Sequence, residues 1–336
     1  MGITSLILLT ACLPFAESAD EVPSWDETPE PAHVVHQPVR LAQEPTTSIP
    51  SVRRVPWWDR RSMFGRELAE EVKDFGLSFE GRYTHDLFYV SAERGNAVRQ
   101  SRFLDLGISL DAERAFGWSG TSFYVEGYVT GGNGPTGLIG DYQVVSNIEA
   151  PPLEIVSEVW WEQWYGDESV RTKVGKIDLN TEFALSTSAL EFINSSMGFS
   201  PTIFTLPTFP EPAFGVCAEW LPTEHWAIRA GVYDGAQQEG ISTGGLGPST
   251  FFGPPADLFL IGQLDLSWSA GGDLPGRLGF GAWEHTGTFE RFDGGSDEHT
   301  TGTFAVLDQA LPSPGEQGVL DSFAQLAARG ESRGVR

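Results

Sequence analysis

Apolar and polar residues alternate with a period of two along most of the chain from Leu77 onward. In the first such segment Leu77, Phe79 and Tyr83 share one face, while Glu80 and Arg82 occupy the other. The same period recurs in residues 103–111, 123–129, 214–221, 226–233, 258–268, 277–283 and 303–309, with turn-forming stretches at 117–120 and 271–273. A period of two belongs to β-strands with two different faces, and the pattern predicts an all-β chain with about ten or eleven readable strands.

The polar face of these predicted strands carries carboxylates, arginines, glycines and tyrosines rather than the Lys, Thr and Ser of a typical water-exposed face. Such a face suits a water-filled lumen, with the apolar face toward lipid. A soluble β-sandwich would also alternate, so the period alone favours a transmembrane antiparallel β-barrel only modestly. The composition of 11 Trp and 22 Phe against 3 Met also favours a barrel, because these residues suit strands and aromatic girdles better than a helical bundle.

The N-terminal quarter of the chain lacks this alternation. Residues 1–19 form a short apolar run that ends in small residues, which we interpret as an export signal although no Lys or Arg lies near Met1. Cleavage at the small residues 16–18 and lipoprotein processing at Cys12 both fit the sequence. Residues 20–56 are rich in Pro, Glu, Thr and Ser and predict a disordered linker. Residues 57–76 predict a short amphipathic helix segment that ends at Gly76, before a β domain over 77–336.

One long stretch, residues 173–201, interrupts the strands. It begins as a strand and then becomes a polar loop that contains Phe183 and Phe192. A loop of this length in a strand-rich chain is functional or disordered, and its apolar residues argue against disorder. The residues expected to form a constriction are Glu182, Phe183, Glu191, Asn194 and Ser195. An equally weighted alternative is that such residues only satisfy loop backbone groups and attach the loop to the wall.

Charge and titratable residues exclude several functions. The formal net charge of -25 makes nucleic acid a poor partner, because phosphate repels such a surface. The two cysteines, Cys12 and Cys217, give no disulfide framework, and Cys217 suits a small apolar strand position. The 6 histidines lack ligand spacing, so we expect no metal site and no cofactor.

Several separate segments resemble the carbohydrate-selective porins of the OprB family. The similarity runs in register from about residue 65 to about residue 325 and is carried by residues 65–88, 104–128, 140–165 and 173–201. Its most specific parts are Ser-Asn-Ile-Glu-Ala-Pro-Pro at 146–152 and Phe-Ile-Asn-Ser-Ser at 192–196.

The resemblance implies a Gram-negative outer-membrane barrel of sixteen antiparallel strands, with an inward-folded loop and sugars as the diffusing solutes. It also implies outer-membrane lipid and the barrel-assembly machinery as partners, while homo-oligomer formation stays open. Family members are longer and end in further strands and a terminal aromatic residue, whereas this chain ends Ser-Arg-Gly-Val-Arg. We therefore expect the closing strands to be missing from the sequence, as in a truncated copy or a chain that a partner completes.

A sugar pore needs groups that hydrogen-bond hydroxyls, charges that set a field and aromatic faces along which pyranose rings slide. Opposed acidic and basic rows are our hypothesis for the constriction, although any one such residue is more often an ordinary lumen-facing group. The residues expected to line the pore are Glu80, Arg82, Asp86, Asp105, Tyr124, Glu126, Tyr128, Arg171, Lys173 and Arg229.

Two other classes of function compete with a pore. Glu158 and Glu162, set among tryptophans, are typical of a glycan hydrolase subsite, but four residues along a strand separate them by about 13 Å, too far for a catalytic pair. The tryptophans suit an interface girdle or a sugar-stacking surface better. A structural or adhesive outer-membrane protein would share the alternation, so no enzyme is expected but this last alternative stays open.

Overall fold

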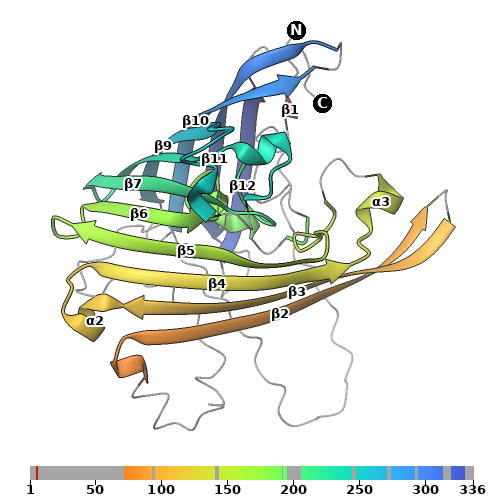
Figure 1. Cartoon of the computed structure of the whole chain (residues 1–336). Coiled ribbons are helices and arrows are strands. Elements are labelled where there is room, and N and C mark those ends of the chain that lie inside the picture. Colours follow the sequence, from red (N-terminus) through yellow and green to blue (C-terminus); the bar gives the residue numbers. More distant parts are fainter. Residues whose placement is uncertain are drawn as a thin grey trace.

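The structure, a computed structural model, describes residues 5–6, 72–92, 95–140, 144–190, 192–194, 206–243, 247–270, 274–291, 294–312 and 319–329. Its main feature is one antiparallel sheet in which each strand from β2 to β12 pairs with the next along the chain (Figure 1). The strands are β2 (Leu77–Ala92), β3 (Gly95–Asp111), β4 (Thr121–Gly132), β5 (Leu153–Tyr165), β6 (Val170–Ile177), β7 (Ala213–Thr223), β8 (Trp226–Asp234), β9 (Leu258–Ala270), β10 (Leu274–Glu290), β11 (Ser296–Pro312) and β12 (Val319–Arg329). A two-residue strand, β1 (Ser5–Leu6), pairs with β12.

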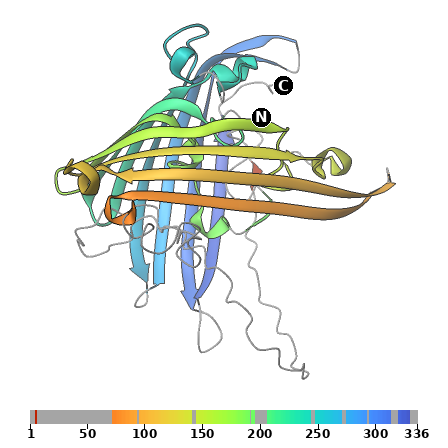
Figure 2. The ribbon, with the colours of Figure 1, turned by 60° about the horizontal axis from the view of Figure 1, so that its bottom comes forward.

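The sheet curls strongly, so that β2–β5 run at a steep angle to β10–β12 (Figure 2). Among the described strands, β2 lies at one edge and β1 at the other, and no pairing closes the sheet. The predicted all-β antiparallel class and the ten or eleven strands are confirmed, whereas sixteen strands remain an expectation from the resemblance.

Helical segments are short and lie between strands. They are α2 (Ala112–Phe116), α3 (Thr136–Ile139) and the 3-10 turns η2 (Leu179–Thr181), η3 (Thr187–Ala189), η5 (Ala236–Glu239) and η6 (Gly247–Ser249). No helix in the described ranges is long and apolar enough to cross a membrane. Residues 72–74 are helical and residues 75–76 form a turn. The remainder of the predicted helix segment, 57–71, lies outside the described residues, as do residues 1–4 and 7–56 of the predicted signal and linker.

The turn between β3 and β4 shows how local sequence sets these connections. Asp111 caps α2, since its carboxylate accepts a hydrogen bond from the Arg114 N–H at 3.1 Å. Gly117 then ends the helix with φ 73°, a left-handed conformation that glycine adopts at little cost. The chain reverses within nine residues (112–120) and β4 starts antiparallel to β3.

The two faces of the sheet differ as the alternation predicts. On β10, Leu278 and Phe280 are exposed on the outer face, whereas Arg277 and Trp283 are buried on the inner one. The apolar core lies on this inner side, where the segment after β6 packs against the wall. Its members are Ile177, Leu179, Phe183, Ala184, Leu206, Cys217, Tyr233, Phe259, Ile261, Trp283, Phe304, Val306 and Ala327.

Candidate pore lining and constriction loop

Charged side chains of alternating sign cross the inner face of seven neighbouring strands. We call this row the charged belt; it consists of Glu162 on β5, Arg171 and Lys173 on β6, Glu219 on β7, Arg229 on β8, Asp265 on β9, Arg277 on β10 and Asp308 on β11. Each of these side chains is at most 15% exposed. Buried charges require partners of opposite sign. The belt therefore links neighbouring strands through ion pairs and also presents charges of both signs on the inner face.

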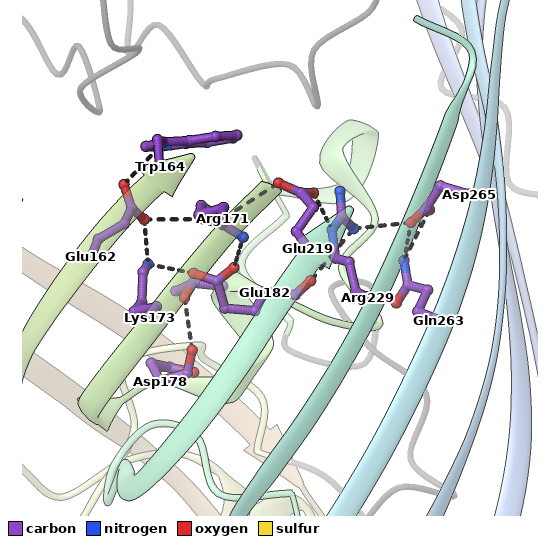
Figure 3. Close-up of polar contacts among 11 residues, drawn as sticks. Glu162, Trp164, Arg171, Lys173, Asp178, Glu182, Glu219, Arg229, Gln263 and Asp265 are labelled. Atoms are coloured by element: carbon purple, nitrogen blue, oxygen red, sulfur yellow. Dashed lines mark hydrogen bonds and ion pairs between the residues drawn. The ribbon is translucent and has the colours of Figure 1, made fainter. Parts of the chain in front are cut away.

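The first half of the belt is centred on two arginines that share Glu219. Arg171 Nη1 lies 3.3 Å from Glu162 Oε2, and its Nε lies 3.3 Å from Glu219 Oε2. Arg229 Nε donates to the other oxygen of Glu219 at 2.6 Å, and its Nη1 donates to Asp265 Oδ2 at 3.0 Å. The pairing of β6 with β7 and of β7 with β8 places these residues opposite one another. Figure 3 shows the row from Glu162 to Asp265.

The second half of the belt continues through Arg277. Its Nη1 lies 3.6 Å from Asp265 Oδ1, and its Nη2 donates to Asp308 Oδ2 at 2.7 Å. Arg277 and Asp308 are direct cross-strand partners of β10 and β11. Every arginine of the belt therefore contacts at least two carboxylates, and the row has no large region of a single sign.

The segment between β6 and β7, which we call the constriction loop (178–212), inserts Glu182 into the belt. Its carboxylate accepts hydrogen bonds from both Arg171 and Lys173 (Figure 3). Burial alone would raise the pKa of Glu182, but the two cations outweigh burial and hold that pKa below its ordinary value. Glu182 thus stays ionised and joins the loop to the wall through a bifurcated ion pair.

Three more contacts carry the loop along the inner wall. The Ala184 N–H donates to Gln263 Oε1 on β9 at 2.8 Å, and Ser186 Oγ donates to Asp308 Oδ1 on β11 at 2.8 Å. Further on, the ring of Phe192 packs 5.6 Å from that of Phe323 on β12. The loop therefore follows the wall from β6 to β12.

The last part of the constriction loop, residues 206–212, contacts the wall at β3 and β4, close to the start of the loop. The ring of Phe209 packs 5.5 Å from Phe103 and 5.6 Å from Tyr128, whose hydroxyl donates to the Pro210 carbonyl. Asp178 joins the two ends, because its carboxylate accepts from Thr208 Oγ1 at 2.6 Å and from the Phe209 N–H at 3.2 Å. Both ends of the constriction loop are thus fixed to one side of the wall.

The predicted pore-lining residues fall into two groups. Arg171, Lys173 and Arg229 belong to the charged belt, as described above. The others lie on β2–β4. Among the described contacts of this second group, Tyr124 donates to Glu80, Arg82 pairs with Asp105 at 2.8 Å, Ser146 donates to Asp86 at 2.7 Å, Ser157 donates to Glu126 at 3.0 Å and Tyr128 binds the loop at Pro210. Their role in permeation stays a prediction.

Arg82 gives the simplest test of this second group. Its side chain is half exposed on the inner face and bonded to a nearly buried Asp105. We expect Arg82→Ala to change ion conductance or sugar flux, because it removes a half-exposed positive charge from the wall. Unchanged transport by this variant in planar bilayers would place Arg82 outside the constriction.

The predicted constriction residues are placed unequally. Glu182 lies in the belt, and Phe183 is fully buried against the wall, with its ring edge-on to Tyr233 at 6.3 Å. Asn194 donates to the Val144 carbonyl at 3.4 Å. Glu191 and Ser195 lie outside the described residues. For Glu182 and Phe183 these contacts favour attachment of the loop to the wall, which is the alternative to a role in narrowing the pore.

Five polar residues of the inner face were not predicted from the sequence: Glu219, Gln263, Asp265, Arg277 and Asp308. A usable signal was present, because each is a polar residue at an inner position of a strand whose outer positions are mainly apolar. Applied to residues 213–223, 258–270, 274–290 and 296–312, this rule finds most of the missing belt.

Aromatic rings accompany the belt on the inner face of β5. Trp160 stacks on Tyr124 with ring centroids 5.1 Å apart, and Lys173 Nζ lies 4.2 Å from the Trp160 centroid. Trp164 Nε1 donates to Glu162 Oε1 at 3.2 Å. Trp161, in contrast, points to the opposite face of the strand, where it pairs with Phe123. The tryptophans of β5 therefore divide between the lumen side and the outer side.

The carboxylates behind the hydrolase alternative do not face each other. Glu158 and Glu162 share the inner face of β5, where Trp160 Nε1 donates to Glu158 at 2.9 Å and Glu162 is held by Arg171 and Lys173. Among the described residues no group of His, Cys, Asp and Glu side chains could hold a metal ion.

A curled antiparallel sheet with an apolar outer face, a charged inner face and a loop folded along that face defines a porin-type barrel wall. The family model for carbohydrate-selective porins of the OprB family matches residues 76–330, and the chain belongs to that family, whose proteins are outer-membrane β-barrel transport channels. The resemblance drawn from the motifs is thereby confirmed.

One solved structure agrees with the fold. The high-pH structure of Pseudomonas putida OprB superimposes with a TM-score of 0.68 at 17% identity and covers 79% of this chain and 69% of that one. The low-pH structure of the same protein gives 0.40 at 11% identity, covering 80% and 97%, and a mutant of Rh. blastica porin gives 0.27 at 9%, covering 75% and 99%. No curated protein sequence matches the chain.

Proposed function

We propose that the chain lines a diffusion pore for monosaccharides and small oligosaccharides in the outer membrane of a Gram-negative bacterium, to which its N-terminal segment directs it. The observation that carries this proposal is the charged belt, which crosses seven strands on the inner face. It meets the constriction loop at Glu182. Barrel-assembly machinery and surrounding lipid are the partners that such a wall requires, and assembly into a homo-oligomer is compatible with it.

The belt suits neutral, hydroxyl-rich solutes. Its acidic and basic groups alternate over short distances, so an ion of either sign meets both attraction and repulsion along the wall. A sugar hydroxyl both donates and accepts hydrogen bonds and can exchange water for either kind of group. Entering the pore therefore costs a neutral sugar less free energy than it costs an ion of similar size.

Trp164 supplies the aromatic part of this surface. Its indole bonds to Glu162, and Arg171 Cζ lies 5.8 Å from its ring centroid, so the ring is oriented beside the belt. A pyranose ring has an apolar face that packs on an indole while its hydroxyls reach neighbouring polar groups. Trp164 thus combines a stacking surface with hydrogen-bonding groups next to it.

Sugar flux through purified protein in liposomes tests the proposal. Wild type is expected to admit mono- and disaccharides. Trp164→Ala is expected to raise the sugar concentration that gives half-maximal flux by about three- to tenfold, given the usual strength of an aromatic contact. Trp161→Ala is the matched control, because Trp161 lies three residues away on the outer face and should leave half-saturation unchanged.

Three outcomes would count against the pore or against the role of Trp164 in it. A heat-modifiable barrel that passes no sugar would favour the structural or adhesive alternative. Equal effects of the Trp164 and Trp161 variants would remove Trp164 from the permeation path. Glycan hydrolysis by the purified protein would support the enzymatic alternative.

A further inference from the structure

The loop between β4 and β5 is a fixed platform at one side of the inner face. Ser146 Oγ donates to Asp86 on β2 at 2.7 Å. Glu149 accepts from the N–H and the hydroxyl of Thr136 at 3.2 and 2.9 Å. Gly134 lies so close that a Cβ there would come within 2.0 Å of the Glu149 carboxyl carbon. The platform is therefore hydrogen-bonded to the wall, and its own two ends are hydrogen-bonded to each other.

This platform contacts the far part of the constriction loop through three hydrogen bonds, which we call the loop clasp. The backbone N–H of Asn147 donates to the Ile193 carbonyl at 2.7 Å, and its side-chain Nδ2 donates to the Phe192 carbonyl at 2.6 Å. In the opposite direction, Asn194 Nδ2 donates to the Val144 carbonyl at 3.4 Å. The clasp joins the two sequence motifs, 146–152 and 192–196, that had been singled out separately.

The clasp holds a part of the loop that is attached differently from the rest. Residues 178–190 are anchored through buried charged groups, above all Glu182 and Asp308. The described contacts of residues 192–194 include a ring contact with Phe323 and the neutral hydrogen bonds of the clasp, and Ile193 is 57% exposed. Removing one partner of a neutral hydrogen bond costs less than removing one partner of a buried ion pair, so the clasp is the attachment that is easier to disrupt.

We propose that Asn147 is a positioning residue of the pore, whose side chain holds the constriction loop against the β4–β5 loop so that the two loops together set the solute size limit. The inference rests on the proposed sugar-pore function. It assigns size selection to the loop clasp, which carries no charge, and leaves charge selection to the belt.

Asn147→Ala separates these two roles. Loss of one neutral hydrogen bond changes the equilibrium between the attached and the detached loop by about two- to tenfold, toward the detached form. The ratio of trisaccharide to monosaccharide flux in liposomes should rise by a similar factor. The reversal potential in a salt gradient should not move, because the change leaves every charge in place. Asn133→Ala is the matched control, since Asn133 lies in the same loop but accepts from Gln100 on β3 at 3.3 Å.

The outcomes distinguish this inference from the function on which it rests. A wild-type protein impermeable to every sugar would overturn the proposed function and this inference with it. A permeable wild type with the same flux ratio in Asn147→Ala would overturn the inference alone. If Asn147→Ala forms no heat-modifiable barrel, Asn194→Ala tests the clasp from its other side. Failure of both variants to form a barrel, with Asn133→Ala intact, would assign the clasp to folding instead.

Discussion

Replacing Glu182 with glutamine should raise single-channel conductance and relax discrimination between sugars, because the constriction loop loses its ionic attachment to the wall. Arg171 and Lys173 then keep their charges while losing one carboxylate partner each. Removing one partner from a buried ion pair costs about 3 to 5 kcal/mol. A change of about 3 kcal/mol alters the detached population of the loop by more than about a hundredfold. Conductance of single channels in planar bilayers measures this directly.

Glu211→Gln provides the control for Glu182→Gln. It makes the same chemical change in the same loop, but Glu211 accepts from Ser242 rather than from the charged belt. Its conductance should match that of wild type. Equal conductance increases in both variants would show that the loop responds to lost charge in general, and would remove Glu182 as its particular anchor.

The pH dependence gives a second test of the same anchor. Because the folded-state pKa of Glu182 is lowered, its contribution is fully present above the ordinary glutamate pKa of about 4.3 and is lost only as pH falls through the lower value. The loop should therefore stay attached from pH 7 to pH 5. A wild-type rise in conductance within that interval, absent from Glu182→Gln, would contradict this assignment.

Local sequence was sufficient to predict which face each strand presents. The alternation in β8 placed Arg229 and Tyr233 on one face and Trp226 and Ile228 on the other, as the structure has them. The reason is geometric: successive side chains of a strand point to opposite sides, and only one side can meet an apolar environment. The all-β class and the face to which each side chain points thus follow from short windows of sequence.

The path of the constriction loop could not be predicted in the same way. Ser186 bonds to Asp308, which lies 122 residues further along the chain, and Ala184 bonds to Gln263, 79 residues away. These contacts depend on the curl of the whole sheet, which no local pattern encodes. The contacts of Glu162 are easier to predict, because its partners Arg171 and Lys173 lie on the next strand. The short turn at residues 166–169 fixes the pairing of β5 with β6, and this pairing would have indicated the first ion pairs of the belt.

Removing the charge of Arg229 should destabilise the barrel more than removing that of any half-exposed arginine. Arg229→Ala leaves Glu219 and Asp265, which are 10% and 1% exposed, without the guanidinium that lies between them. The expected loss is about 3 to 5 kcal/mol, because two buried carboxylates lose a shared partner. The temperature at which the folded gel band converts to the unfolded one in detergent measures it, and should fall clearly. Cation permeability should rise over anion permeability, because the wall loses one positive charge.

Two further variants determine whether buried charge pairing is the cause. Arg82→Ala removes an arginine whose side chain is 51% exposed, so its effect on the conversion temperature should be smaller. Asp265→Asn introduced into Arg229→Ala should recover part of the lost stability, because it removes the charge of one of the two buried carboxylates that lost Arg229 as a partner, while keeping the shape of the side chain. Charge pairing predicts that the double variant is more stable than Arg229→Ala alone. If the double variant is less stable, Arg229 acts through the packing of its side chain, and the belt is a structural seam between strands more than an electrostatic one.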